Sequence, residues 1–299
     1  MFSRRHPYLF FILVFSSISA VAIIVISLLF VLGTRDSGYD DLISGGEKVG
    51  IIEIKGVIAE SRDIIHKLKR FREDDSIRAI VLRIDSPGGG VGPSQEIFRE
   101  VRKTVKLKKV VASMGAVAAS GGYYIAAGTN GIVANPGTIT GSIGVIMGFT
   151  NFQELFRKIG LVPVVVKSVE YKDMGSPVRD MTEDERKILQ DLSSNIHKQF
   201  VTAISEGRKM DLSRVKSIAD GRIFSGEQAK ELGLVDRLGN LEDAIEWAGR
   251  MAGIKGKISS VYAPEKKTSF LKYLIESSMK ELADRTVNTD LNVDYLYRP

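Results

Sequence analysis

One serine and one lysine in this chain have surroundings that suit nucleophilic chemistry. Ser120 lies in S-M-G-A-V-A-A-S-G-G-Y-Y, where a β-rich stretch leads into small residues, and a helix-like segment follows. A serine on a tight turn at a helix start has an exposed hydroxyl, and nearby backbone N–H groups point at the group it attacks. Lys172 follows in V-E-Y-K-D-M-G-S-P. Together the two suggest a serine nucleophile with a lysine base.

Both residues also have ordinary interpretations. Serine beside glycine is commonly a helix N-cap. With 42 Lys and Arg in the chain, a given lysine is by default a solvated surface charge. A lysine base must be neutral, and the free amine has a pKa of about 10.4 that burial can lower by several units. The apolar stretch 162–169 before Lys172 favours a neutral amine, whereas the adjacent Asp173 opposes it.

Other catalytic groups are not indicated. His6, His66 and His197 have no distinctive context, so no histidine base is predicted. The chain lacks H-E-x-x-H and any dense carboxylate–histidine cluster, so neither a metal nor a cofactor is predicted. The run D-S-P-G-G-G at 85–90 has neither dinucleotide nor P-loop spacing, and alone it favours a strand-to-helix turn.

Composition narrows the class of protein further. The 299 residues suffice for one large domain or two small ones. There is no cysteine, which excludes disulfides and thiolate metal sites. The net charge is +6, but Lys and Arg are scattered among Asp and Glu. Since no basic face with interleaved aromatic residues is evident, nucleic-acid binding is not predicted.

The N-terminal region predicts a membrane anchor. Residues 7–34 carry no charge, and the apolar core 9–32 is long enough to span a bilayer. This core exceeds the apolar region of a cleaved signal peptide, and the small residues at 20–22 that could mark a cleavage site lie inside it. Arg4 and Arg5 precede the core, which predicts a cytoplasmic N-terminus and an extracytoplasmic remainder.

Strand and helix patterns alternate after the anchor, which predicts an α/β domain with a mostly parallel sheet. Thr182, with Glu185 three residues later, predicts a capped start for a long helix. The expected strands are 48–54, 77–85, 109–113, 131–134, 140–147 and 162–169, and the expected helices are the one after Ser120, 62–74, 94–105, 152–159, 182–209, 226–232 and 241–252. The expected organisation is a cytoplasmic segment 1–7, an anchor 8–33, a linker 34–47, a catalytic domain 48–255 and a tail 256–299 with an amphipathic helix at 269–284 and a disordered or partner-dependent end.

Five separated motifs together are similar to a known family. They are R-I-D-S-P-G-G-G, S-M-G-x-x-A-A-S-G-G-Y-Y, T-I-T-G-S-I-G-V, Y-K-D-M-G-S-P and I-A-D-G-R-I-F-S-G-x-x-A-x-x-L-G-L-V-D. From about residue 48 to 241 the chain resembles the signal peptide peptidase SppA family, of the short bacterial type with one protease domain. The resemblance implies a Clp-protease/crotonase-like fold and a serine endopeptidase that degrades remnant signal peptides after signal peptidase releases them.

The resemblance also implies a role for each matching residue. Ser120 matches the nucleophile, Lys172 the general base, and Ser142 a hydroxyl that orients the lysine amine. The backbone N–H groups of Gly89 and Gly121 match the oxyanion hole. A homo-oligomeric ring is implied, with active sites shared between subunits at the outer face of the cytoplasmic (inner) membrane. Two alternatives remain: a crotonase-type acyl-CoA enzyme, and an inactive membrane scaffold that keeps the fold.

Overall fold

The structure, a computed structural model, describes Tyr8 and residues 15–21, 23–25, 27, 47–264 and 293–296. The chain forms two compact units, Met1–Gly46 and Glu47–Pro299. Residues 15–21 of the first unit are helical. None of the helices formed by the described residues combines the length and apolar character needed to span a bilayer. Most of the predicted anchor, 8–33, and the whole of the predicted helix 269–284 lie outside the described residues.

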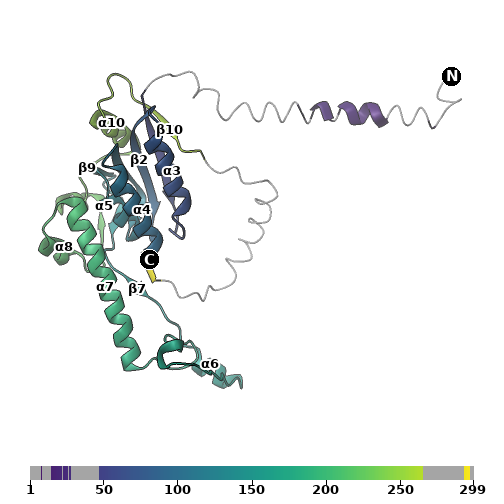
Figure 1. Cartoon of the computed structure of the whole chain (residues 1–299), viewed down its shortest axis with the longest axis vertical. Coiled ribbons are helices and arrows are strands. Elements are labelled where there is room, and N and C mark those ends of the chain that lie inside the picture. The colour runs from purple at the N-terminus through teal and green to yellow at the C-terminus, as the bar shows by residue number, and fades with distance from the viewer. Residues whose placement is uncertain are drawn as a thin grey trace. The chain divides into compact units, whose positions relative to one another are not determined.

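In the second unit, strands and helices alternate along most of the chain (Figure 1). In chain order the elements are β1 (Lys48–Lys55), α3 (Arg62–Glu73), β2 (Ile77–Ser86), β3 (Gly88–Gly90), α4 (Val91–Thr104), β4 (Lys109–Ala119), α5 (Gly121–Ala127), β5 (Gly131–Ala134), β6 (Ile139–Gly141), β7 (Ile146–Met147), α6 (Gln153–Lys158), the 3₁₀ helix η2 (Glu170–Asp173), α7 (Glu183–Arg208), α8 (Leu212–Ile218), β8 (Ile223–Ser225), α9 (Gly226–Glu231), β9 (Arg237–Leu238), α10 (Leu241–Met251), β10 (Ser259–Tyr262) and β11 (Val293–Leu296).

The main sheet is almost wholly parallel, as the alternation of strands and helices predicted. Its strands follow the order β10-β1-β2-β4-β5-β9, and every neighbouring pair on this path is parallel. Strand β6 pairs in parallel with the end of β4, and β8 adds to β6 in the antiparallel sense. A second, small antiparallel sheet has the order β3-β11-β7. The protein is therefore a mixed α/β fold with a mostly parallel sheet.

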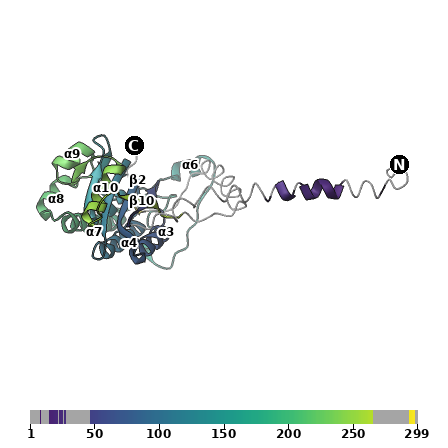
Figure 2. The ribbon, with the colours of Figure 1, turned by 90° about the horizontal axis from the view of Figure 1, so that it is seen from above.

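Helices cover both faces of the main sheet, because alternate residues of each central strand point to opposite sides. Val49 and Ile51 of β1 pack in the core beneath α10. Ile52 and Ile54 pack in the larger core, which contains residues of α3, α4, α5 and α7. Helices α3 and α4 lie side by side on that second face (Figures 1 and 2). This burial on both faces explains the near-continuous apolar runs of the central strands.

Most predicted elements are confirmed, with shifts of a few residues at their ends. The predicted strand 140–147 is instead two short strands, β6 and β7, separated by the irregular residues 142–145. The capping box at the start of α7 is present: Thr182 Oγ1 accepts from the N–H of Glu185, and the Glu185 carboxylate accepts from the N–H of Thr182. The predicted strand 162–169 is wrong, because residues 161–167 have no regular secondary structure. Val162, Val164 and Val166 are 83%, 84% and 95% exposed, and no strand among the described residues pairs with their backbone groups.

Candidate active site

Ser120 occupies a strained turn between β4 and α5. Its backbone angles are φ 52° and ψ −117°, a conformation that residues with a side chain rarely adopt. The serine stands at the N-cap position, but its side chain makes no capping hydrogen bond. The hydroxyl also makes no hydrogen bond with any other described residue, and the residue is 1% exposed. Ser120 is therefore not a capping residue. The strained turn instead presents a side-chain hydroxyl that makes no structural hydrogen bond with the described residues.

Neighbouring elements hold this turn from both sides. The N–H of Ser120 donates to the carbonyl of Gly141 at the end of β6 (2.9 Å), and the N–H of Tyr124 donates to the Ser120 carbonyl (2.8 Å). In the first turn of α5, the buried Tyr123 hydroxyl donates to the carbonyl of Leu234 (2.9 Å), and burial raises the pKa of this phenol above its usual range. The N–H of Gly121, in the same turn of α5, is one of the groups that a helix leaves unpaired at its start.

The backbone N–H of Gly89 points to one edge of strand β3, because Ile58 pairs with the other edge. Ile58 donates its N–H to the Gly88 carbonyl and accepts from the Gly90 N–H, each at 2.9 Å. Because successive peptide groups of a strand point to opposite edges, the N–H of Gly89 faces away from Ile58. A Cβ on Gly89 would lie 2.4 Å from the Ile58 carbonyl oxygen, so only glycine allows this close approach. Ser86 Oγ anchors the strand by accepting from the Gly88 N–H (3.1 Å).

The motif aspartate that precedes β3 is structural. Between Ile84 and Ser86 the register of β2 against β4 shifts, which marks an irregularity in the ladder. Asp85 Oδ1 accepts from the N–H of Val117 there (3.1 Å), and a Cβ on Gly115 would lie 2.7 Å from the Asp85 carboxyl carbon. The motif therefore aligns the ends of β2 and β4, which lead directly into β3 and Ser120.

Ser142 is buried directly after Gly141, which holds the Ser120 turn. It has φ 50°, and its N–H donates to the carbonyl of Arg222 (2.8 Å). Ser142 and His197 both line a cavity of about 340 Å³. The buried Nε2 of His197 has no hydrogen-bond partner among the described residues. Its sequence context indicated nothing, because proximity to Ser142 depends on how α7 packs.

Lys172 is not brought to this site within one chain. It belongs to η2, it is exposed, and its amine makes no hydrogen bond or ion pair with a described residue. The adjacent Asp173 is instead paired with Lys167 (2.6 Å) and Arg179 (2.9 Å). These hydrogen bonds hold the pKa of the Asp173 carboxyl well below its usual range. The carboxylate that seemed to oppose a neutral lysine is thus directed toward two other cations.

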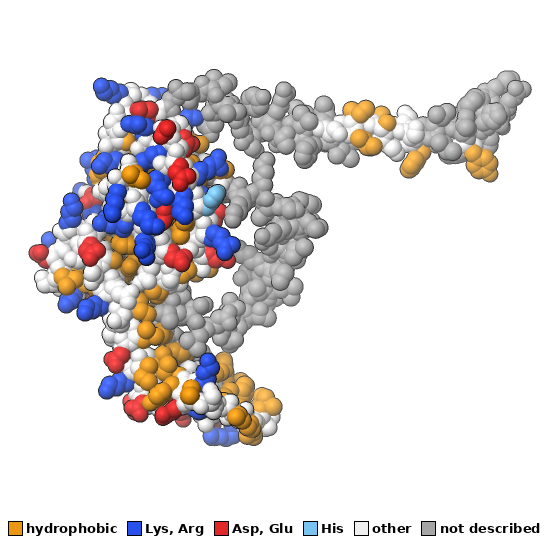
Figure 3. All heavy atoms as spheres, in the orientation of Figure 1, with side chains coloured by type: hydrophobic (Ala, Val, Ile, Leu, Met, Phe, Trp, Pro, Cys, Tyr) orange, Lys and Arg blue, Asp and Glu red, His pale blue; other side chains and the backbone are white. Residues whose placement is uncertain are grey.

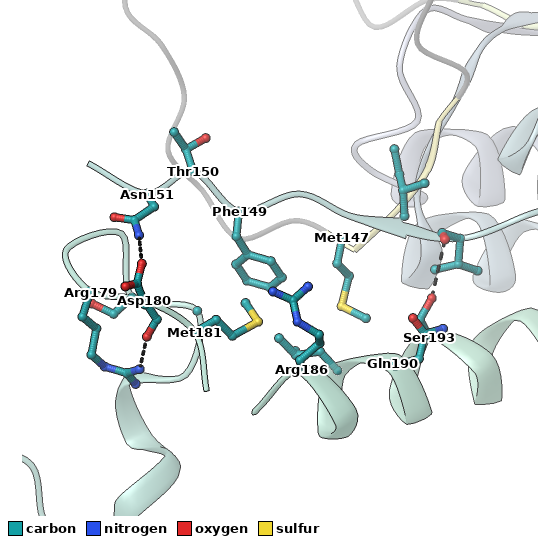
Figure 4. Close-up of a pocket in the computed structure, with 15 residues that line it drawn as sticks. Met147, Phe149, Thr150, Asn151, Arg179, Asp180, Met181, Arg186, Gln190 and Ser193 are labelled. Carbon is teal, nitrogen blue, oxygen red and sulfur yellow. Dashed lines mark hydrogen bonds between the residues drawn. The ribbon is translucent and has the colours of Figure 1, made fainter. Parts of the chain in front are cut away.

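A second cavity, of about 770 Å³, lies where the segment that carries α6 leaves the body. Figure 4 shows Met147, Phe149 and Met181 on its walls, with Arg186 from α7 among them. Polar groups close one end, where Asn151 Nδ2 donates to Asp180 (2.8 Å). Because methionine side chains adapt their shape, such walls suit apolar groups of varied outline.

Comparison with known proteins identifies the family of the chain. A family model described as "Peptidase family S49" matches residues 102–255, which include Ser120, Ser142 and Lys172. The chain belongs to peptidase family S49. A model described as "Clp protease" matches residues 40–139, which include Gly89.

Several relatives carry the same assignment in their names. "Putative protease slr0021" of Synechocystis sp. is 47% identical over 70% of this chain and 76% of its own length. "Putative signal peptide peptidase SppA" of Enterococcus faecium is 38% identical over 68% of this chain and 63% of its own length. "Putative protease MJ0651" of Methanocaldococcus jannaschii is 34% identical over 82% of this chain and 81% of its own length. The S49 protein is thus a serine peptidase. This assignment disfavours both alternatives from the sequence, the crotonase-type acyl-CoA enzyme and the inactive scaffold.

Proposed function

We propose that this S49 protein is a membrane-anchored serine endopeptidase that degrades remnant signal peptides. Ser120 is its nucleophile, and Lys172 of a neighbouring subunit is its base. The observation that carries the proposal is a contrast between two side chains. The Ser120 hydroxyl on its strained turn and the exposed Lys172 amine both lack a hydrogen-bond partner among the described residues, yet they lie on separate parts of the fold. The name of the E. faecium relative supports the substrate class.

The chemistry follows from the two groups and the surrounding amides. The neutral Lys172 amine accepts the proton of Ser120 Oγ as this oxygen attacks a peptide carbonyl, and the resulting ammonium protonates the leaving amine. The N–H groups of Gly89 and Gly121 stabilise the tetrahedral oxyanion, each by about 3–4 kcal/mol. Ser142 orients the lysine amine. Water then hydrolyses the acyl-enzyme, and the lysine again acts as the base.

The segment that carries α6 and η2 supports a shared site. Figure 1 shows α6 well away from α5, beyond the start of α7. Hydrophobic side chains gather on this lobe in Figure 3, and Leu155, Ile159 and the exposed valines of 162–166 contribute to its surface. A monomer rarely exposes so large an apolar patch, so the lobe fits an interface with a second copy. Repeated head-to-tail contacts of this kind close into a ring.

Membrane attachment suits the proposed substrate. The apolar run 9–32 and the leading Arg4 and Arg5 are the basis for an uncleaved anchor with a cytoplasmic N-terminus. The catalytic unit is then held at the outer face of the cytoplasmic membrane, where released signal peptides reside. The adaptable walls of the 770 Å³ cavity, with Met147 and Met181, suit the apolar side chains of such peptides.

Subunit mixing tests the shared site. Ser120→Ala and Lys172→Ala chains are each expected to be inactive alone. In a random one-to-one ring, about one quarter of the interfaces pair an intact serine with an intact lysine, so about one quarter of the activity should return. Lys158→Ala, at another exposed lysine on the same lobe, is the matched control and should remain active alone. Mixed rings that are verified by mass yet show no recovery would place both residues in one chain.

A further inference from the structure

The amino ends of the parallel strands lie along one edge of the main sheet, and this edge is strongly basic. In the register, Lys48 of β1 lies opposite Ile77 of β2 and Ser259 of β10, while Ala79 of β2 lies opposite Lys109 of β4. The segments that bound the edge, called the basic edge below, are 47–48, 74–78, 105–109 and 250–257. They contain eight Lys and Arg and three Asp and Glu, a net charge of +5, whereas the whole chain has a net charge of +6. The fold thus gathers cations that are scattered along the sequence.

The positive charge of the basic edge is not used up by the fold. Four of its lysines are exposed, and their amines make no hydrogen bond or ion pair with a described residue: Lys106, Lys109, Lys255 and Lys257. Two of the three carboxylates are already engaged. Asp74 accepts from the N–H (2.9 Å) and the hydroxyl (2.6 Å) of Ser76, and Glu47 pairs with Arg78 (3.3 Å). The edge therefore presents free ammonium groups to an external anion.

The loop 105–109 places an apolar side chain among these lysines. Lys108 donates to the carbonyls of Phe71 (2.8 Å) and Asp74 (2.5 Å), which holds the loop against the end of α3. Leu107, next to it, is 73% exposed. A cavity of about 320 Å³ separates this loop from the end of α10. An apolar side chain flanked by lysines suits a bilayer surface, where the ammonium groups meet phosphates and the apolar group reaches the acyl boundary.

The chain also enters the second unit at the basic edge. Strand β1 starts at Lys48, directly after the linker 34–47 that follows the apolar run 9–32. A flexible linker of this length spans about 20 Å on average. In Figure 1, α10 and β10 lie at one end of the unit and α6 lies at the other. If the apolar run is held in a bilayer, the basic edge is the part of the unit that the linker keeps near the headgroups.

We propose that the basic edge binds the anionic headgroups of the bilayer that holds the anchor. The proposal rests on the anchor of the proposed function, and it adds which face of the catalytic unit meets lipid. Each lysine close to an anionic surface favours contact by about fivefold, provided that it lies within a Debye length of about 8 Å. Ser120 follows the carboxyl end of β4, at the opposite edge of the sheet. A substrate peptide must therefore extend out of the bilayer to reach it.

A single thiol can report this contact, because the chain has no cysteine. Leu107→Cys is labelled with bimane in the full-length protein, which is reconstituted into vesicles that contain a spin-labelled lipid as quencher. Quenching is expected with about one third phosphatidylglycerol, but not with phosphatidylcholine alone, and it should be lost near 1 M salt. A label at Val57→Cys, 60% exposed beyond the carboxyl end of β1, should stay unquenched in both lipids. Equal quenching at position 107 in the two lipids overturns the proposal.

Charge reversal tests the lysines themselves. Lys106→Glu with Lys109→Glu should lower the contact equilibrium at least about 25-fold, since two fivefold contributions are lost. The matched control, Lys216→Glu with Lys230→Glu, makes the same change of charge at exposed positions of α8 and α9 and should leave quenching unchanged. Equal effects of the two pairs would show that only the total charge matters, which overturns the proposal.

An independent pair guards against a folding defect in one loop. Lys255→Glu with Lys257→Glu, in the loop before β10, should act like the pair at 106 and 109. If neither pair changes the quenching, another occupant covers these lysines, such as the linker carboxylates Asp36, Asp40 and Asp41 or an acidic protein, and the lipid proposal is wrong.

Flotation of the unlabelled full-length protein with the same vesicles separates this proposal from the proposed anchor. Protein that floats with both lipid compositions supports the anchor, and quenching then decides the role of the basic edge. Protein that floats only with phosphatidylglycerol vesicles overturns the anchor but supports the basic edge. Protein that floats with neither composition overturns both. Since no readout requires turnover, a failure of the proposed catalysis leaves these outcomes unchanged.

Discussion

Ser120 is 1% exposed at the junction of β4 and α5, whereas Lys172 lies on an exposed segment outside the main sheet. The serine turn is held by hydrogen bonds to β6 and within α5. The segment 170–180, which carries Lys172, is held instead by the ion pairs of Asp173 and by hydrogen bonds of Arg179 to Glu185 and of Asn151 to Asp180. The fold thus stabilises one half of the proposed dyad in a strained conformation and leaves the other half accessible to another molecule.

Because of this difference, substitutions at the serine turn should affect both stability and activity, whereas substitutions at Lys172 should affect activity alone. A change at the serine turn alters backbone strain and packing as well as chemistry. A change of the Lys172 side chain removes no hydrogen bond or ion pair with a described residue, so a loss of activity there reports chemistry or assembly. Substitutions in the two regions should therefore have different effects on thermal stability even where both abolish turnover.

The largest effect is expected at Ser120. Ser120→Ala and Ser120→Gly should each lower kcat by about 10⁴-fold or more, because the nucleophile is lost. Glycine accepts φ 52° without strain, so Ser120→Gly should be about 1 kcal/mol more stable than Ser120→Ala. Peptide turnover and thermal unfolding of the purified proteins measure the two effects. Substantial turnover by either variant contradicts the assignment of the nucleophile.

Lys172 should show a comparable loss of activity without any loss of stability. Lys172→Ala and Lys172→Arg should both be inactive, since a guanidinium does not deprotonate, and the melting temperature should stay within error. Parent activity should rise with pH, because only the neutral amine accepts a proton. His197→Gln is the control, as His197 lines the cavity beside Ser142. If this variant loses the rising limb and Lys172→Arg keeps it, histidine is the base.

A smaller loss is expected at Gly89. In Gly89→Ala the new methyl group would lie 2.4 Å from the Ile58 carbonyl oxygen, so β3 must shift. The shift moves the N–H of residue 89 away from the proposed oxyanion position. Losing one such donor lowers kcat by about 10²–10³-fold. Gly92→Ala is the matched control, because a Cβ there meets nothing within 4 Å. Steady-state kinetics of the two variants measure this, and equal rates would remove Gly89 from the catalytic machinery.

The sequence predicted the Ser120 turn because its determinants are local. Small residues, two glycines and a following helix pattern lie within a dozen positions, and the same holds for the Thr182 capping box. The central strands were also predictable, since burial on both faces requires continuous apolar runs. These features depend on residues close in the sequence or on burial alone, and not on any particular distant partner.

Features that depend on distant partners were missed or misassigned. The valines of 162–169 have high β propensity, yet no strand in the described part of the chain pairs with them. The approach of Ile58 to Gly89 and the pairing of β11 with β3 join segments that no local pattern connects. The Lys172 amine has no partner among the described residues, so its proposed role depends on a contact with a second copy that no local pattern predicts.

The smallest effect is expected from acid, at the ion pairs that join the segment 170–180 to α7. Arg179 donates to Asp173 and to Glu185 of α7, and these hydrogen bonds lower the pKa of Glu185 to about 2. A carboxyl whose pKa is depressed in the folded state contributes stability above its unfolded value of about 4.5, and this contribution is lost as the pH falls toward 2. Between those values, protection of the backbone amides of 170–180 from hydrogen exchange should decrease before that of the β4–α5 turn.

Glu185→Gln is the control for this acid effect. The amide cannot titrate, and it keeps an oxygen that can accept from the Thr182 N–H, as Glu185 does at 2.9 Å. In this variant the exchange protection of 170–180 should start lower at neutral pH and change less between pH 4.5 and 2, because the titrating carboxyl is gone and the strongly lowered pKa of Asp173 keeps its pair with Arg179 charged over this range. If parent and variant instead lose protection in parallel, the ion pairs do not hold the lysine segment against α7, and its position depends on contacts with a second copy.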